Sequence, residues 1–491
     1  MRVRGLAFGF CALAAASFGI TACGGGGGAS GAGVVPAPTS ARGHHGSGSG
    51  SITHIVLLIQ ENRTFNNLFA GFPGATSSKT GLELVPNTSG TGYIQKQIAL
   101  TETPLTDHGN ITHLYAAFLT GWDNGKMDSF NLIKRITNGK IEGKAPYQYV
   151  NPKGVAPYRT IAKQWGLSDQ MFQTQGSDSF TAHQDLIRGG TCISSVYTCE
   201  NPSSYTISLI DPPTTNAAWG CDSKAGSKTT TINGDLQVSK AGGPAPCSKD
   251  FPDYGSGGYD TLRDLLDAKS VSWKYYTPKW KNDTPSALWD AFDVIAPVRY
   301  GSEWNTNIVS PETTIFSDIT NGTLPAMSWV IPKAENSDHP GYSQKDTGPS
   351  WVASVVNAIG QSQYWNSTAV IVVWDDWGGF YDPVAPPTPR DDQGGPGFRV
   401  PMLVVSPYAK IGNGSQGGYV SHTVYEFGSI IRFIEDTFNL GRLGTTDQTS
   451  TSMGDMFDFN QSPRPFQTIP STYKREFFVR QRPSDLPVDT E

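Results

Sequence analysis

His54-Ile-Val-Leu-Leu-Ile-Gln60, a short run of apolar and β-branched side chains, leads directly into Glu61-Asn62-Arg63. Because no polar residue interrupts its middle, the run predicts a strand buried on both faces, as in a parallel sheet. Similar runs recur at residues 328–331, 369–374 and 402–405. We therefore expect these segments to form strands of one central sheet.

Helical patterns lie between and after the apolar runs, at residues 258–269, 349–362 and 425–438. Alternating strands and helices predict an α/β fold with a mostly parallel sheet flanked by helices. Residues 301–321 look instead like a long connection. The abundance of Gly (55) and Pro (34) indicates a globular protein rich in loops.

The N-terminus has the pattern of an export signal. Two arginines lie within the first four residues, and a run of apolar and small residues extends to Ala22. Cys23 and five glycines follow, which resembles a bacterial lipoprotein processing site. We expect an exported chain that is anchored at the cell envelope through acylated Cys23. The alternative is cleavage nearby without a lipid, which would give a periplasmic or secreted protein.

Composition and cysteine spacing predict the remaining domain boundaries. Residues 1–23 form the signal peptide, 24–51 a Gly/Ser-rich linker, 52–466 the folded domain and 467–491 a C-terminal tail. Four cysteines remain after export, and an oxidising compartment favours two disulfides. Of three possible connectivities we favour the local pairs Cys192–Cys199 and Cys221–Cys247. These would pin residues 191–253, a polar stretch, as an insertion over the sheet edge.

Charge and hydropathy limit the partners. A formal net charge of -6 gives no basic footprint for nucleic acid, so no nucleic-acid partner is expected. After the signal segment, no apolar run is long enough to span a membrane.

Acidic residues follow two of the predicted strands. Glu61 and Asn62 come directly after the first, and Asp375 and Asp376 follow residues 369–374. Ligands of open α/β sheets bind beyond the carboxyl ends of the strands, so both groups fall where a site is expected. Carboxylates gathered there either gain protons or hold a cation. The alternative for each acid taken alone is that it caps a loop.

Ser179 lies where polar turn residues give way to a helical pattern, in Gln175-Gly-Ser-Asp-Ser179-Phe-Thr-Ala-His183. A helix start offers free N–H groups and a positive dipole end, which stabilise a phosphate or a serine alkoxide. The alternative is that Ser179 is only the N-cap. The segment contains no Gly-x-Ser-x-Gly motif, so an esterase of the α/β-hydrolase type is not supported.

Two histidines are candidate ligands or proton donors, because each lies in a polar loop. His113 ends the segment Asp107-His-Gly-Asn-Ile-Thr-His113, and His339 follows Asp338 and precedes a proline. His54 opens a buried strand and is interpreted as structural, and His422 is the least certain of the loop histidines.

Taken together, these segments resemble the bacterial phosphoesterase family that contains the phosphatidylcholine-type phospholipases C and the broad-specificity acid phosphatases. The resemblance extends from about residue 51 to residue 466. The motifs that carry it are Glu61-Asn62-Arg63-Thr64-Phe65, Gly125-Lys126-Met127-Asp128, Ser179-Phe180, Ser337-Asp338-His339-Pro340 and Trp374-Asp375-Asp376-Trp377-Gly378-Gly379-Phe380-Tyr381-Asp382. The chain departs from the family pattern at Asn66 and Pro383.

The resemblance implies an alkaline-phosphatase-like α/β sandwich and a role for each motif. One or more metal ions, divalent or iron, would be held by Glu61, Asn62, Asp375 and Asp376. Ser179 would attack phosphorus and form a phosphoserine that water hydrolyses. His113 and His339 would contact the phosphoryl oxygens or the leaving group. The residues expected to bind substrate are Lys126, His183 and Asp338.

The expected function is metal-dependent hydrolysis of phosphate esters, of the phospholipase C or acid phosphatase type, with a phosphate ester such as a phospholipid as substrate. A sulfatase ranks lower, because the chain has no Cys/Ser-x-Pro-x-Arg segment near Ser179. The alternative from another class is a surface lipoprotein without catalysis that binds glycans or protein partners. The aromatic content of 11% keeps that alternative open.

Overall fold

The computed structural model describes residues 50–106, 109–192, 207–211, 220–222, 228–233, 238–239, 259–279, 289–342, 346–387 and 395–486. The chain divides into two units, Met1–His44 and His45–Glu491. The predicted signal peptide, Cys23 and nearly all of the linker lie outside the described residues. Within the described ranges, none of the helices combines the length and the apolar character needed to cross a bilayer.

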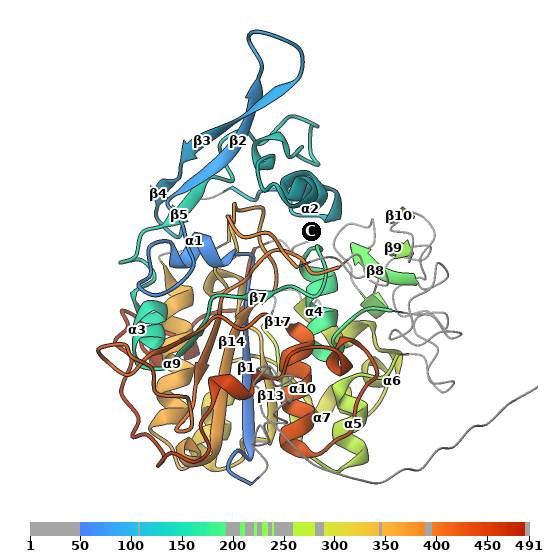
Figure 1. Ribbon diagram of the computed structural model, residues 1–491. Coiled ribbons are helices and arrows are strands. Elements are labelled where there is room, and N and C mark those ends of the chain that lie inside the picture. The colour runs from blue at the N-terminus through green and yellow to red at the C-terminus, as the bar shows by residue number, and fades with distance from the viewer. Residues whose placement is uncertain are drawn as a thin grey trace, which may run out of the picture. The chain divides into compact units, whose positions relative to one another are not determined.

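The second unit is built on an eight-stranded sheet in the order β12-β11-β13-β1-β14-β15-β6-β16 (Figure 1). The strands are β1 (His54–Gln60), β6 (Gly166–Ser168), β11 (Trp273–Tyr276), β12 (Ile308–Val309), β13 (Met327–Val330), β14 (Thr368–Trp374), β15 (Met402–Val405) and β16 (Tyr419–Ser421). β1 lies at the centre and pairs in parallel with β13 and β14. The prediction of a mostly parallel sheet of buried strands is therefore confirmed.

β15 is the exception, because it runs antiparallel to both of its neighbours, β14 and β6. A parallel neighbour needs a crossover that returns the chain to the other end of the sheet. The described part of the connection between β14 and β15 contains no helix, so the chain re-enters the sheet from the end where β14 left it.

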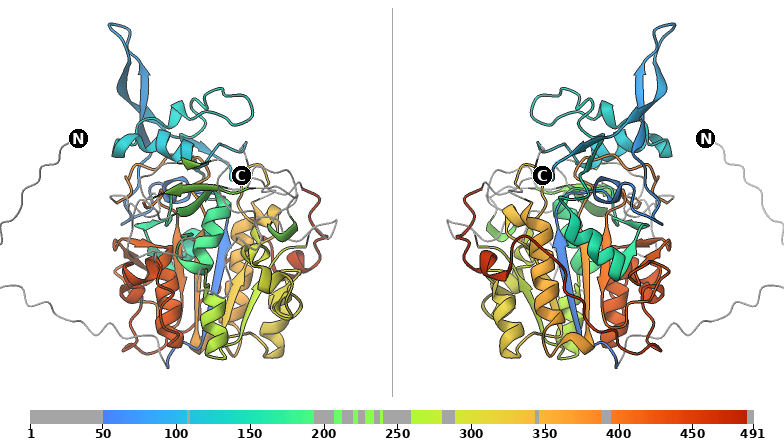
Figure 2. Two further views of the ribbon diagram at one scale, coloured as in Figure 1. Left: turned by 90° about the vertical axis from the view of Figure 1, so that its right-hand side faces the viewer. Right: turned by 90° about the vertical axis from the view of Figure 1, so that its left-hand side faces the viewer.

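Helices cover both faces of the sheet (Figures 1 and 2). α9 (Thr347–Gly360) packs with α3 (Ala156–Gln164), α8 (Thr314–Asn321) and α11 (Arg475–Val479). On the other face, α4 (Ser179–Arg188) packs with α5 (Leu262–Ala268) and α10 (Phe427–Phe438). The predicted helices at residues 258–269, 349–362 and 425–438 are thus confirmed as α5, α9 and α10, with ends shifted by a few residues.

The core follows from the apolar runs. Every residue from Ile55 to Ile59 in β1, and every residue of β14, is buried. Full burial of an aliphatic side chain contributes about 1.5–3 kcal/mol. The central strands therefore form a well-packed core, and the loops at their carboxyl ends project from it.

A second lobe lies above those carboxyl ends (Figure 1). It contains β2 (Thr80–Pro86), β3 (Tyr93–Ala99), β4 (Thr101–Thr103), β5 (Gln148–Val150) and α2 (Tyr115–Trp122). A separate apolar cluster holds it, and this cluster includes Phe118, Phe130, Tyr147, Trp377 and Phe398. Since Trp377 and Phe398 come from the loop after β14, the lobe packs directly on the segment that carries Asp375 and Asp376.

The remaining elements are short. They are α1 (Phe65–Phe69), α6 (Ala296–Arg299), α7 (Glu303–Thr306), β7 (Met171–Phe172), β17 (Tyr425–Glu426), and the 3-10 turns Asp123–Gly125, Phe130–Leu132, Gly220–Asp222, Ala291–Val294, Ala334–Asn336, Trp365–Ser367, Thr446–Gln448 and Met453–Met456.

The predicted long connection at residues 301–321 is wrong, because α7, β12 and α8 lie within it. Ile308 and Val309 pair with Tyr275 and Tyr276 of β11. The two-residue strand β12 is too short to leave a recognisable apolar run.

The predicted insertion is described only in part. β8 (Ile207–Asp211), β9 (Thr230–Asn233) and β10 (Val238–Ser239) form a small antiparallel sheet. Cys192 and Cys221 each take part in a disulfide. Cys199 and Cys247 lie outside the described residues. The predicted pairing, and the insertion that it would pin, stay predictions.

Candidate functional site

Strand pairing brings the two acidic groups together. Gln60 at the end of β1 lies beside Trp374 at the end of β14, so the residues that follow the two strands are neighbours. The backbone N–H of Asp375 donates to the carbonyl of Gln60 at 2.9 Å. The backbone N–H of Asn62 donates to Oδ1 of Asp375 at 2.8 Å. Glu61, Asn62, Asp375 and Asp376 are all buried.

Helix α4 delivers a hydroxyl to this edge. Ser179 is the first residue of α4 and Asp178 is its N-cap, one position before the predicted cap. The Ser179 hydroxyl donates to Oδ2 of Asp376 at 2.8 Å. It also accepts a hydrogen bond from Nδ2 of Asn62 at 3.2 Å. The structure therefore unites the helix start with residues from both strands.

His183 lies one turn further along α4, on the same side of the helix as Ser179. Its Nε2 atom is 3.1 Å from Oε1 of Glu61 and 3.7 Å from Oδ2 of Asp375. His183 was predicted to bind substrate, and in the structure it lies between two carboxylates. The four-residue spacing from Ser179, which puts both side chains on one helix face, was the signal available in the sequence.

Glu61, His183 and Asp375 form a group that suits a cation. One potential ligand atom from each lies within 4.8 Å of the others. Among the described residues, Oδ2 of Asp375 and Oδ1 of Asn62 are buried and accept no hydrogen bond. A mixed oxygen and nitrogen donor set fits a borderline transition metal better than Mg²⁺ or Ca²⁺. The donor group thus fits the metal that the resemblance implies.

Asp376 lies on the Ser179 side of this group. Its Oδ1 atom accepts from the backbone N–H of Gly378 at 2.7 Å. Burial and the negative charge of Asp375 raise the pKa of Asp376 well above its usual range. A carboxyl group with a raised pKa, bonded to a serine hydroxyl, is suited to exchange a proton with it.

His113 reaches the same place from the upper lobe. Its Nδ1 atom is 2.7 Å from the carbonyl of Ile111. A carbonyl only accepts, so the proton lies on Nδ1 and Nε2 is the acceptor. That Nε2 atom is 3.0 Å from Nδ2 of Asn62 and 3.7 Å from Oδ2 of Asp376. The indole N–H of Trp377 donates to the His113 carbonyl at 3.0 Å and fixes the segment.

Close backbone contacts explain the glycines after Asp376. Asn62 has a φ of 58°, and Gly378 has a φ of 58°. A Cβ atom on Gly378 would lie 2.1 Å from the carbonyl oxygen of Asn62. Only glycine allows the two strand-end loops to approach this closely.

Three other predicted residues have different surroundings. Lys126 is 61% exposed and pairs with Asp123 at 2.9 Å. The Asp338 carboxylate accepts from the Tyr158 hydroxyl at 2.7 Å and from the Trp374 indole at 3.2 Å. Within the described ranges, no hydrogen bond or ion pair joins Lys126 or Asp338 to Ser179.

His339, the third of these residues, lies in an aromatic setting. It is buried, and its ring lies 4.4 Å from that of Tyr342 and 6.0 Å from that of Trp289, measured between centroids. Its Nδ1 atom is 2.7 Å from the carbonyl of Pro340. These contacts hold the ring in place among aromatic side chains.

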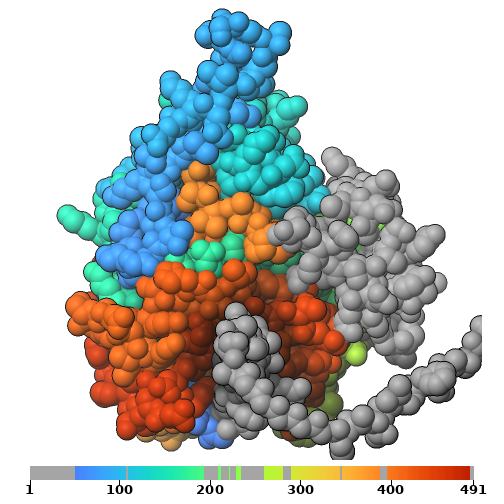
Figure 3. Space-filling model, viewed as in Figure 1, coloured from blue at the N-terminus to red at the C-terminus, as the bar shows by residue number. Residues whose placement is uncertain are grey.

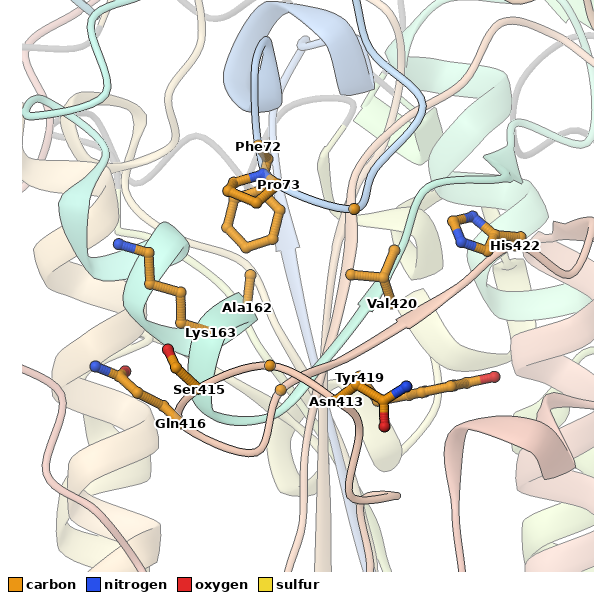
Figure 4. A pocket seen from close by; sticks show the side chains of 13 residues that line it. Phe72, Pro73, Ala162, Lys163, Asn413, Ser415, Gln416, Tyr419, Val420 and His422 are labelled. Atoms are coloured by element: carbon orange, nitrogen blue, oxygen red, sulfur yellow. The ribbon is translucent and has the colours of Figure 1, made fainter.

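A separate cleft of about 580 Å³ opens beside β16 (Figure 4). Phe72, Lys163, Tyr419, Val420 and His422 contribute to its lining. Of the described residues that line it, none carries a carboxylate and none belongs to the group around Ser179. Of these two places, the strand ends are therefore the one with the geometry for nucleophilic chemistry.

Comparison with known sequences supports a family assignment. The sequence model of the Phosphoesterase family matches residues 52–441. The chain is 24% identical over 481 residues to a non-hemolytic phospholipase C of Pseudomonas aeruginosa, an alignment covering 87% of this chain and 60% of that protein. It is 23% identical over 460 residues to phospholipase C B of Mycobacterium tuberculosis, covering 84% of this chain and 79% of that one. The chain thus matches less than two thirds of the Pseudomonas relative.

Among solved structures, one that the chain matches is a protein in the alkaline phosphatase superfamily from Vibrio parahaemolyticus. The identity is 10%, the TM-score is 0.32, and the match covers 83% of this chain and 69% of that chain. A TM-score of this size supports no conclusion about this chain. The family match over residues 52–441 includes Glu61, His113, Ser179 and Asp376, and with it the chain belongs to the Phosphoesterase family, whose name denotes hydrolases of phosphoric ester bonds.

Proposed function

We propose that this protein hydrolyses phosphate esters with Ser179 as the nucleophile and a phosphoserine as the intermediate. The observation that carries the proposal is the 2.8 Å hydrogen bond from the Ser179 hydroxyl to Asp376, at the start of a helix and beside Glu61, His183 and Asp375. Family membership supports the same reaction class. An alkaline-phosphatase-like fold and an exported location remain part of the proposal.

The first half of the reaction needs a proton acceptor and a stabilised oxyanion. Asp376 accepts the hydroxyl proton as the Ser179 oxygen bonds to phosphorus. The free N–H groups at the start of α4 and the Asn62 amide stabilise the charge on the phosphoryl oxygens. A bound cation, held by Glu61, His183 and Asp375, would supply positive charge to the serine oxygen and the phosphoryl group.

The same step needs a proton for the leaving group, and the phosphoserine that it forms then needs a water molecule. His113, which lies 3.7 Å from Asp376, is suited to pass the proton from that carboxyl group to the leaving oxygen as the phosphorus–oxygen bond breaks. Water then attacks the phosphoserine and the bond between phosphorus and the Ser179 oxygen breaks. The proton of the water passes through Asp376 to that oxygen, which restores Ser179 and releases phosphate or a phosphorylated head group. His339, Lys126 and Asp338 stay candidates for contacts to the substrate.

We propose a phospholipid or a related phosphodiester as the substrate. The support is that relatives from Pseudomonas aeruginosa and Mycobacterium tuberculosis carry the name phospholipase C. The lipid alcohol that such a reaction would release from the phosphoryl group also matches the need for a protonated leaving oxygen.

A Ser179→Ala variant tests the proposal. Turnover of p-nitrophenyl phosphate and p-nitrophenyl phosphorylcholine should fall by a factor on the order of 10⁴ or more, as loss of a covalent nucleophile does elsewhere. Metal content, measured on the same preparations, should not change, because Ser179 is not in the donor group. Ser177→Ala is the matched control, and it should keep wild-type turnover. Wild-type rates in Ser179→Ala would remove this serine from the reaction.

A further inference from the structure

A short hairpin in the upper lobe, residues 134–144, exposes two isoleucines. We call it the 134–144 loop. Lys134 and Ile141 form an antiparallel bridge, and the backbone N–H of Arg135 donates to the carbonyl of Lys140 at 2.9 Å. Ile136 is 52% exposed and Ile141 is 54% exposed. Single exposed apolar residues are common, but these two share one ordered turn.

Cations surround the two isoleucines. Lys134, Lys140 and Lys144 are exposed, and none has a carboxylate within ion-pair distance in the described part of the chain. Arg135 instead pairs with Glu142 at 2.8 Å. The whole chain has a net charge of -6. The positive charge of the loop is therefore local, and it favours an anionic surface.

The loop is attached to the segment that bears His113. The backbone N–H of Ile136 donates to Oγ1 of Thr112 at 3.2 Å. The backbone N–H of Thr112 donates to Oε1 of Glu142 at 3.4 Å. Thr112 directly precedes His113, whose Nε2 atom is 3.0 Å from Nδ2 of Asn62. Whatever binds the loop is thus held near the Ser179 site.

A second element of the same lobe has a similar character. Tyr93 and Ile94, at the tip of the β2–β3 hairpin, are both exposed. Figure 3 shows this hairpin, in blue, projecting from the lobe, and Figure 2 shows it from two further sides. The lobe therefore carries apolar tips on the side away from the central sheet.

We propose that the 134–144 loop docks the enzyme on an anionic phospholipid bilayer, with Ile136 and Ile141 in the head-group region and the three lysines at the lipid phosphates. The proposal rests on the proposed function, since it brings a phospholipid to Ser179. Isolated apolar side chains set among cations are typical of interfacial binding to anionic lipids. A stable protein partner would need about 800 Å² of surface on each side, which a single hairpin does not offer.

The test uses the full chain carrying Cys23→Ser, so that no acyl anchor contributes. Binding to vesicles of phosphatidylcholine with 30% phosphatidylserine is compared with binding to pure phosphatidylcholine. We expect the protein to bind the anionic vesicles at least about tenfold more tightly than the pure phosphatidylcholine vesicles, and we expect added salt to weaken that binding. Ile136→Ser with Ile141→Ser, and separately Lys134→Gln with Lys140→Gln and Lys144→Gln, should each weaken anionic binding about tenfold or more.

The matched controls are Ile411→Ser, at another exposed isoleucine, and Lys269→Gln, at another exposed lysine. Both should bind vesicles as the parent does. All variants should hydrolyse p-nitrophenyl phosphorylcholine at the parent rate and keep the parent melting temperature, which excludes misfolding. The docking proposal would be overturned if the loop variants bound anionic vesicles as tightly as the parent. It would also be overturned if the parent bound no vesicles, in which case a protein partner would be the remaining occupant of the loop. Absent hydrolysis of soluble esters in every variant would instead overturn the proposed function.

Discussion

Two groups of buried acids follow the same strand, β14, and they are neutralised in different ways. Asp382 pairs with buried Arg399, whose Nε and Nη2 atoms lie 2.9 and 2.8 Å from Oδ1. The backbone N–H of Asn66 adds a hydrogen bond at 3.1 Å. Asp375 and Asp376, a few residues earlier, have no lysine or arginine within ion-pair distance in the described part of the chain.

The difference shows which buried acids the chain completes by itself. Burial raises the pKa of Asp382, while the charge of Arg399 acts in the opposite direction. For Asp376, both burial and the neighbouring charge of Asp375 raise the pKa. A buried ion pair with its hydrogen bonds is a structural unit. A buried acidic group without a fixed cation is suited to hold one from solution.

Asp338 represents a third case, in which burial favours the protonated carboxyl group. Burial raises its pKa to about 7, against the hydrogen bond from Tyr158, the charge of Arg63 and the hydrogen bond from Trp374, which act to lower it. Because Trp374 directly precedes Asp375, its hydrogen bond to the Asp338 carboxyl group helps to fix the end of β14. Asp338 itself is not one of the three residues of the donor group.

Among changes to the buried acids, the largest effect should come from Asp375→Asn, which removes a charge from the donor group. We expect turnover to fall by about 10³-fold, since several kcal/mol of charge stabilisation are lost in the transition state. Bound metal, measured by elemental analysis, should fall with it. Asp318→Asn, at an acid that pairs with Lys274 away from the site, is the control for a general effect of losing a carboxylate. Full metal content and turnover in Asp375→Asn would contradict the view that this acid helps to hold a cation.

Stability should separate the two acidic groups in opposite directions. Arg399→Met leaves Asp382 buried and unpaired, and should lower the free energy of unfolding by about 3–5 kcal/mol. Asp382→Leu in the same chain should restore part of that loss. Metal-free Asp376→Asn should instead be no less stable than the parent, because it relieves repulsion from Asp375. Urea unfolding of the metal-free proteins measures all of these changes, and a stable Arg399→Met would show that the pair is dispensable.

The sequence predicted that the residues after β1 and β14 would lie together, because continuous apolar runs end directly at Glu61 and Asp375, and neighbouring parallel strands place their ends side by side. It did not predict the pairing of Asp382 with Arg399. Such a contact depends on how the loop after β14 folds back, which has no local pattern. The direction of β15 was missed for the same reason. His183 was found but grouped with substrate, because its relation to Glu61 exists only after α4 packs on the sheet.

Metal removal should produce a smaller loss of stability, and only proteins with an intact donor group of Glu61, His183 and Asp375 should show it. A ligand present at one hundred times its dissociation constant stabilises the folded state by about 2.7 kcal/mol. Chelation should therefore lower the melting temperature of the parent and of Ser179→Ala. Chelation should leave Asp375→Asn unchanged, because that variant holds little metal to lose. Equal shifts in all three proteins would indicate a cation site elsewhere in the chain.

The effect that is smallest over a single pH unit should be a change in the pH dependence of stability in Asp338→Asn. The folded pKa of Asp338, about 7, lies above its ordinary value of 3.8. Between these two values the folded protein holds a proton that the unfolded chain releases, so this group makes stability fall as the pH rises through that window, by at most about 1.4 kcal/mol per pH unit. The amide of this variant would keep an acceptor for the Tyr158 hydroxyl but would not titrate. Urea unfolding of the metal-free proteins from about pH 3 to about pH 8, a range that spans both pKa values, should show a flatter slope in Asp338→Asn than in the parent. Parallel slopes would mean that Asp338 is already ionised across this range, and that its neutralisation resembles that of Asp382 more than we infer.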